Sequence, residues 1–206
     1  AKEKLFTEHS VFDGFFLSFI SGLLGARLAY IIIHFDEFGF DVPRWIFVNA
    51  YPGFDLYGGL LAIIGMVWLL FRQSKTIPFW ELLDGMMRAL AIAYAIGSIG
   101  GGFAGIEPGA NDTLYKSVLI LVALCVLTGI GKKVRFKAGF AALLLLAIFF
   151  LVNFLVDFVV TNGVYYGQLN VHQWLSVASL FVVGAVLYYH AGRALTDDIT
   201  LIMITF

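Results

Sequence analysis

The sequence predicts an all-α, polytopic transmembrane helical bundle, organised as a single integral membrane domain over residues 1–206. Of these residues, 61% are hydrophobic and 13% are charged, whereas roughly 25% are charged in a typical soluble domain. Six apolar segments are each long enough to cross a bilayer, which takes about 20 helical residues. The six segments are residues 12–34, 55–72, 79–101, 114–131, 138–161 and 170–191.

The charges of the connecting links indicate how the bundle is oriented. The two links at 72–78 and 131–137 together hold six Lys and Arg residues. The three alternate links hold one basic residue, Arg44, beside five acidic residues. Because Lys and Arg concentrate on cytoplasmic loops, we expect both ends of the chain to be cytoplasmic.

The first apolar segment carries small residues suited to close helix packing, such as Gly22 and Gly25, and one arginine, Arg27. An arginine within a span is costly and normally faces protein or water, although it can also reach the outer headgroups by snorkelling. Because Tyr30 and His34 lie on nearly the same helical face, we favour a cavity-facing orientation of Arg27.

The third apolar segment combines a stripe of small residues with a run of three glycines. Small residues at every fourth position allow membrane helices to approach closely, and consecutive glycines favour a break in a helix. We therefore expect this helix to pack along the stripe and to unwind at residues 100–102. Near its other end, Asp84 and Arg88 are interpreted as an ion pair. The stripe consists of Gly85, Ala89, Ala93, Gly97, Gly101 and Gly105.

Polar residues gather in the half of the bundle that the predicted orientation places outside, and we interpret them as a polar chamber in the outer leaflet. Taken alone, Tyr57 and His172 are more often interfacial residues than catalytic groups. Asp157 is expected to have a partner, as is usual for an acidic side chain within a span. The chamber residues are Arg27, Tyr30, His34, Tyr57, Ser98, Asn153, Asp157, His172 and Gln173.

Several classes of protein are excluded by the residue inventory. The single cysteine, Cys125, allows neither a disulfide framework nor a cysteine metal site. The sequence has no phosphate-binding loop, nucleophile elbow or zinc-protease motif, and we expect no metal and no cofactor. Most basic residues lie in short loops or at the ends of the chain, so nucleic acid is not an expected partner. A transporter is a weaker alternative, because no internal repeat is visible.

Six collinear motifs, extending from about Phe12 to Tyr189, resemble those of the prolipoprotein diacylglyceryl transferases of the bacterial inner membrane. Residues 22–30 (GLLGARLAY) resemble G-x-x-x-G-x-R-x-x-Y, residues 57–62 (YGGLLA) resemble H-G-G-L-x-G, and residues 78–105 resemble the stretch that ends in R-I-G-N-F-x-N-x-E. Residues 112–116 (DTLYK) resemble P-x-x-L-Y-E, residues 153–160 (NFLVDFVV) resemble R-F-x-x-E-F-x-R, and residues 168–176 resemble L-S-x-G-Q-x-L-S.

The resemblance implies a multi-pass protein of the bacterial inner (plasma) membrane that acts in lipoprotein biosynthesis. The family has seven spans, so a first span is expected to be missing from this segment. Family members move a diacylglyceryl group from phosphatidylglycerol onto the lipobox cysteine of a prolipoprotein. This reaction needs positive charge near the phosphate leaving group and a base for the thiol. The implied partners are therefore an anionic phospholipid, phosphatidylglycerol, and a lipobox-containing prolipoprotein.

Several polar positions of the family motifs hold other residues in this chain, a pattern typical of a pseudoenzyme or a very divergent enzyme. Tyr57 replaces the family histidine and Ala95 replaces the signature arginine. The remaining replacements are Ser98 and Gly101 for two asparagines, Phe103 for a glutamate, and Asn153 and Val160 for two arginines. The residues that match are Arg27, Gly58, Gly59, Gly97 and, as a carboxylate, Asp157.

Two hypotheses follow. In the first, the protein is a transferase-like enzyme in which Arg27 holds the phosphate of phosphatidylglycerol and Tyr57 or His172 transfers protons. In the second, it is a non-catalytic protein that binds lipid or a partner on the same scaffold. The candidate catalytic residues are Tyr57 and His172. The candidate lipid-binding residues are Arg27, Tyr30, Gly58, Gly59, Gly97, Ser98, Asn153 and Asp157.

Overall fold

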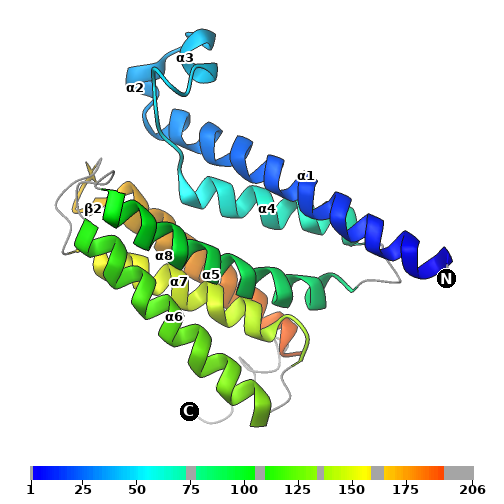
Figure 1. The fold of residues 1–206 in the computed structure, drawn as a ribbon. Coiled ribbons are helices and arrows are strands. Elements are labelled where there is room, and N and C mark those ends of the chain that lie inside the picture. Colours follow the sequence, from blue (N-terminus) through cyan, green and yellow to red (C-terminus); the bar gives the residue numbers. More distant parts are fainter. Residues whose placement is uncertain (1, 73–77, 105–109, 134–136, 159–164, 193–206) are drawn as a thin grey trace, which may run out of the picture. The chain divides into compact units, whose positions relative to one another are not determined.

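The protein is an all-α polytopic membrane protein, as the sequence predicts. A computed structural model describes residues 2–72, 78–104, 110–133, 137–158 and 165–192 (Figure 1). These residues form eight helices and one short β-hairpin. The chain divides into two compact units, Ala1–Leu83 and Asp84–Phe206.

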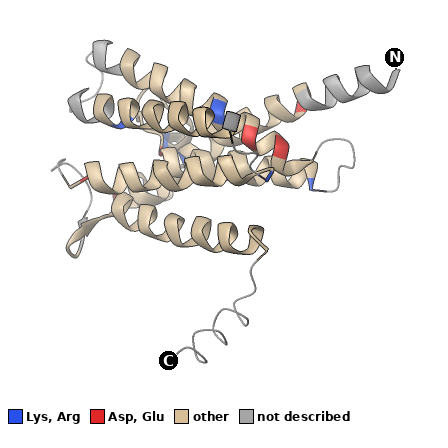
Figure 2. Cartoon of the chain, turned by 90° about the horizontal axis from the view of Figure 1, so that it is seen from below, with Lys and Arg blue, Asp and Glu red and all other residues tan. Residues whose placement is uncertain are grey.

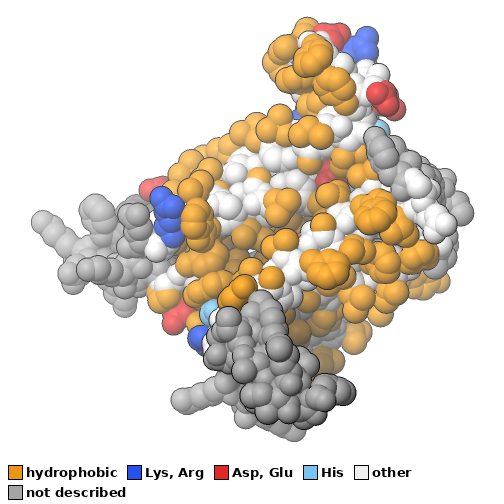
Figure 3. All heavy atoms as spheres, turned by 180° about the vertical axis from the view of Figure 1, so that it is seen from behind, with side chains coloured by type: hydrophobic (Ala, Val, Ile, Leu, Met, Phe, Trp, Pro, Cys, Tyr) orange, Lys and Arg blue, Asp and Glu red, His pale blue; other side chains and the backbone are white. Residues whose placement is uncertain are grey.

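Four of the six predicted spans are confirmed as helical segments long and apolar enough to cross a membrane. They are Phe12–Ile33, Phe79–Gly100, Leu114–Gly131 and Val171–His190. The other two form shorter apolar helices, α4 (Leu56–Phe71, 16 residues) and α7 (Phe140–Val156, 17 residues). The helices run for long stretches without a charged residue (Figure 2). Hydrophobic side chains cover their exposed sides (Figure 3), as expected for surfaces that face lipid.

In the first unit, α1 (Lys2–Ile33) packs along α4 through glycines. A Cβ atom added to Gly25 would lie 2.7 Å from the carbonyl oxygen of Gly58, and one added to Gly58 would lie 2.5 Å from the carbonyl oxygen of Gly25. Only glycine allows backbones to approach this closely. The predicted packing role of Gly22 and Gly25 is thus confirmed.

Residues 34–55 link these two helices and are called the link below. The link forms two short helices, α2 (Phe35–Phe38) and α3 (Val42–Ile46). Helix α3 begins beside Pro43, a residue favoured in a first helical turn because it has no N–H to satisfy. The link is anchored at its far end where Asp55 donates its backbone N–H to the carbonyl oxygen of Ala26, at 2.9 Å. The same Asp55 caps α4 by accepting the backbone N–H of Gly58 at 3.1 Å.

The second unit contains most of α5 (Phe79–Ala104), together with α6 (Ala110–Lys133), α7 and α8 (Val171–His190). Helix α7 packs against both α6 and α8, and eight of its residues are buried. Strands β1 (Tyr165–Tyr166) and β2 (Leu169–Asn170) pair antiparallel and lead into α8. Helix α8 starts at the predicted Asn170, which forms a reciprocal capping box with Gln173.

Two expectations for α5 are wrong. The helix does not unwind at residues 100–102, because it continues to Ala104, and a helix in lipid keeps its backbone hydrogen bonds satisfied even through glycines. The two glycines of the stripe for which the structure shows the surroundings do not pack closely either. A Cβ atom added to Gly85 or Gly97 would meet no described atom within 4 Å, whereas Ala91 and Ala95 on another face are buried. Gly105 lies outside the described residues.

The predicted ion pair between Asp84 and Arg88 is also wrong. The carboxylate of Asp84 instead accepts the backbone N–H groups of Gly139 and Ala142, each at 2.7 Å. Helix α7 starts after Gly139, which has a φ of 86° and no side chain that could cap the helix. Asp84 therefore supplies from α5 the cap that α7 lacks. Among the described residues, the ion pairs join Arg44 to Asp41 and Lys116 to Asp157.

Candidate functional site

Arg27 is buried, 7% exposed, and its guanidinium is surrounded by backbone carbonyls of the link that follows α1. Its Nε donates to the carbonyl oxygen of Trp45 at 3.0 Å, its Nη1 to that of Gly53 at 2.9 Å, and its Nη2 to that of Arg44 at 2.8 Å. The guanidinium also lies over the ring of Phe38, 5.0 Å from the ring centroid. Arg27 thus faces protein, as we expected for an arginine within a span, whereas the predicted polar chamber stays a prediction.

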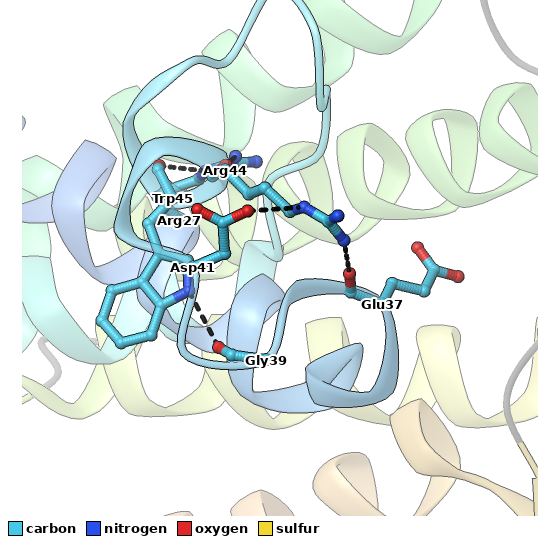
Figure 4. Close-up of polar contacts among 6 residues, drawn as sticks. All are labelled: Arg27, Glu37, Gly39, Asp41, Arg44 and Trp45. Atoms are coloured by element: carbon cyan, nitrogen blue, oxygen red, sulfur yellow. Dashed lines mark hydrogen bonds and ion pairs between the residues drawn. The ribbon is translucent and has the colours of Figure 1, made fainter.

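The link is held in shape around Arg27 by its own polar contacts (Figure 4). Arg44 forms an ion pair with Asp41 at 2.9 Å and donates to the carbonyl oxygen of Glu37 at 2.8 Å. The indole N–H of Trp45 donates to the carbonyl oxygen of Gly39 at 3.1 Å. These contacts tie down the two residues, Arg44 and Trp45, that supply two of the three carbonyl groups that Arg27 uses.

Tyr30, in the last turn of α1, stacks on His34, the residue between α1 and α2, with ring centroids 4.2 Å apart, which confirms that the two side chains lie on one side. Phe38 meets the ring of Tyr30 edge-on at 5.9 Å. The ring of Tyr30 also lies against Gly53, in the space that a Cβ atom of that residue would occupy. Arg27 and Tyr30 therefore hold the same part of the link, one by hydrogen bonds and the other by packing.

Tyr57, Gly58 and Gly59 open α4, directly beside the part of α1 that carries Arg27. Tyr57 is buried, with 5% of its surface exposed, and its interpretation as an interfacial anchor stays a prediction. Gly58 and Gly59 allow the close contact with α1 described above. The predicted site residues of the first unit are thus brought together around the start of α4.

In the second unit, two predicted lipid-binding residues form hydrogen bonds within their own helices. The hydroxyl of Ser98 donates to the carbonyl oxygen of Tyr94 at 2.7 Å, and the amide of Asn153 donates to that of Phe149 at 2.8 Å. Tyr94 and Phe149 meet edge-on, with centroids 5.5 Å apart. Gly97, beside Ser98, is exposed.

Asp157 has the partner that the sequence led us to expect, and that partner is Lys116, a residue that our sequence-based site did not include. The Nζ of Lys116 and the Oδ1 of Asp157 form an ion pair, with side-chain exposures of 16% and 10%. The pair joins α6 to the C-terminal end of α7. A lysine inside the predicted span 114–131 was the signal that could have identified it, because such a residue normally has a partner.

His172 lies in the first turn of α8 and is partly buried, next to the buried Gln173. It has a protein partner. Tyr57 belongs to the first unit and His172 to the second, so the predicted grouping of both in one chamber stays a prediction. Among the residues that the structure describes, no group of three His, Cys, Asp or Glu side chains could hold a metal ion.

Comparison with known proteins identifies the family. The family model described as prolipoprotein diacylglyceryl transferase matches residues 1–190. The phosphatidylglycerol–prolipoprotein diacylglyceryl transferase of Finegoldia magna is 24% identical over 204 residues, covering 91% of this chain and 81% of the relative. That of Aeromonas hydrophila is 25% identical over 212 residues, covering 91% and 76%. That of Teredinibacter turnerae is 28% identical over 199 residues, covering 83% and 68%. The chain therefore belongs to the prolipoprotein diacylglyceryl transferase family.

Proposed function

We propose that this protein is a multi-pass protein of the bacterial inner membrane that binds phosphatidylglycerol through Arg27, and that transfer of the diacylglyceryl group to a lipobox cysteine is slow or absent. The lipid is the one that the relatives' names specify as their substrate. Both ends of the chain lie in the cytoplasm, which places Arg27 in the outer half of the membrane.

The observation that carries the proposal is the uncompensated charge of Arg27. Its three hydrogen bonds go to neutral carbonyl oxygens, and in the part of the chain that the structure describes no carboxylate contacts it. A guanidinium has five N–H donors, so two N–H groups remain, one on each terminal nitrogen. A lipid phosphate has the charge and the oxygens to accept both. Neutralising a cation buried at membrane depth would supply binding free energy for an anionic lipid.

The surroundings of Ala95 and Tyr57 support slow transfer. Ala95, at the position where the family motif has an arginine, is 1% exposed. An arginine side chain at position 95 would fit only if the residues packed against α5 moved. Tyr57, at the position of the family histidine, is buried and already has a protein partner. The phenol of a tyrosine is a weaker base than the imidazole of a histidine.

The alternative is an active transferase in which Tyr57 and His172 transfer protons. The observation in its favour is the length of the family match, which covers residues 1–190. The two proposals share the lipid and differ in whether a thioether is formed on the peptide.

The binding proposal is tested by native mass spectrometry of the protein with equal amounts of phosphatidylglycerol and phosphatidylcholine that carry the same acyl chains. We expect the wild-type protein to prefer phosphatidylglycerol by roughly tenfold, or about 1.4 kcal/mol, because the choline ammonium of phosphatidylcholine offsets part of the attraction between its phosphate and Arg27. Arg27→Ala should abolish this preference, and Arg27→Lys should retain part of it because the charge remains.

Arg88→Ala is the matched control, because it removes an exposed arginine of α5. A thermal unfolding curve for each variant shows that it remains folded. Equal binding of the two lipids by the wild type, or a preference that Arg27→Ala leaves intact, would overturn the proposal.

A further inference from the structure

The link between α1 and α4 exposes large apolar side chains. Phe40 is 86% exposed, Ile46 69% and Phe47 62%. Hydrophobic side chains lie beside charged ones at the top of Figure 3, where α2 and α3 lie. Another side of the link is packed, because the buried ring of Phe38 lies against the guanidinium of Arg27. The link therefore has one side that packs on α1 and one apolar side that the described part of the chain leaves uncovered.

The link stays close to the last two turns of α1, inside its membrane span. The span ends at Ile33, and the backbone N–H of Asp55, the last residue of the link, donates to the carbonyl oxygen of Ala26 at 2.9 Å. Ala26 precedes Ile33 by seven residues, which is about 10 Å along a helix axis. The carbonyl oxygen of Trp45, in α3, is bound by Arg27 of the same two turns. The link is thus tied to α1 at membrane depth, and all of these residues belong to the first unit.

The charges of the link indicate which force holds it there. The link contains four acidic residues and one basic residue, Arg44, and Arg44 is paired with Asp41. Anionic headgroups attract basic segments, so they would not attract this link. Burial of aromatic and aliphatic side chains in the interface depends on apolar area and not on charge. The exposed side chains of Asp36 and Glu37, in α2, are the part of the link suited to water.

We propose that the link is an interfacial anchor, in which Phe40, Ile46 and Phe47 insert among the acyl chains of the lipids while the acidic side chains of α2 stay in water. Lipid is thus the occupant of the exposed apolar side. This side continues the lipid-facing surface of the span, because Ile32 at the end of α1 is 72% exposed. The inference goes beyond the proposed function, since the anchor holds the carbonyl groups around Arg27 at membrane depth whichever lipid binds there.

The test measures the depth of nitroxide labels by electron paramagnetic resonance in liposomes. The labels are attached to Phe40→Cys, Ile46→Cys or Glu37→Cys in a Cys125→Ala background, because Cys125 is the single native cysteine. Glu37→Cys is the control, at an exposed acidic position of the same link. Oxygen concentrates among acyl chains and a nickel chelate stays in water, so the ratio of their collision rates with the label reports depth. Each variant is measured in phosphatidylcholine liposomes and in liposomes that also contain phosphatidylglycerol.

We expect the oxygen-to-nickel ratio to be several-fold higher at positions 40 and 46 than at position 37, and to be the same in both kinds of liposome. A ratio at positions 40 and 46 as low as that at position 37 would show that these side chains face water and would overturn the inference. Low collision rates with both reagents would also overturn it, because protein would then cover the apolar side. So would a high ratio that requires phosphatidylglycerol. The phosphatidylcholine liposomes contain no anionic lipid, so failure of this test is distinct from failure of the proposed function.

Discussion

The glycine contact between α1 and α4 makes a prediction that can be worked out from the geometry. In the variant Gly58→Ala, the added Cβ atom would lie 2.5 Å from the carbonyl oxygen of Gly25 and would also collide with the Cβ of Ala29. Carbon atoms in van der Waals contact are normally about 3.5–4.0 Å apart. Both obstacles are fixed to the α1 backbone, so the helices have to separate by about 1 Å or more. Overpacking of this kind typically costs about 1–3 kcal/mol.

The matched control is Gly65→Ala, in the same helix, where an added Cβ meets nothing within 4 Å of the described residues. Replacing a helical glycine by alanine gains up to about 1 kcal/mol in both variants. The clash offsets this gain only at Gly58, so the two variants should differ by about 1–3 kcal/mol. At about 2–4 °C per kcal/mol for a chain of this size, Gly58→Ala should unfold roughly 2–12 °C below Gly65→Ala in detergent. Equal unfolding temperatures would refute the close packing of α1 on α4.

Two further predictions concern α7 and the orientation of the chain. Asp84→Ala removes both hydrogen bonds to the start of α7 and should lower the free energy of unfolding by about 1–2 kcal/mol. The control Glu81→Ala changes an exposed position of the same helix and should have little effect. Equal losses of stability in thermal unfolding would show that the cap contributes nothing. A cysteine at Gly39 should react with a membrane-impermeant thiol reagent in intact cells, and one at Gln73 should not; labelling at Gln73 would reverse the orientation.

Much of the fold could be predicted because it depends on local sequence. Apolar runs determine where helices lie, and all six predicted segments contain a helix. The start of α8 at Asn170 follows from a capping pattern within four residues. Gly25 was predicted correctly as a packing residue. The similar glycine stripe of α5 was not, because spacing shows that a face is flat but not whether a neighbour lies against it.

The site could be predicted less well, because its contacts join residues far apart in the sequence. The sequence placed Arg27 in a protected position but could not show that carbonyls 17, 18 and 26 residues away would receive its hydrogen bonds. Lys116 and Asp157 are 41 residues apart, and Asp84 lies 55 residues before the Gly139 that it caps. Which of several possible partners a buried charge uses depends on tertiary packing, which neither composition nor periodicity describes.

The measurement that tests the central proposal most directly is transfer to a peptide. A synthetic lipobox peptide is incubated with the protein in phosphatidylglycerol liposomes, and mass spectrometry follows the peptide for the mass of an added diacylglyceryl group. The transferase of Aeromonas hydrophila, a relative of this chain, provides the positive control. We predict that the protein binds the lipid but leaves the cysteine thiol unmodified in the time in which the control converts the peptide. Thioether formation at a rate comparable to that of the control would contradict this account, and Tyr57 and His172 would then be the first residues to replace.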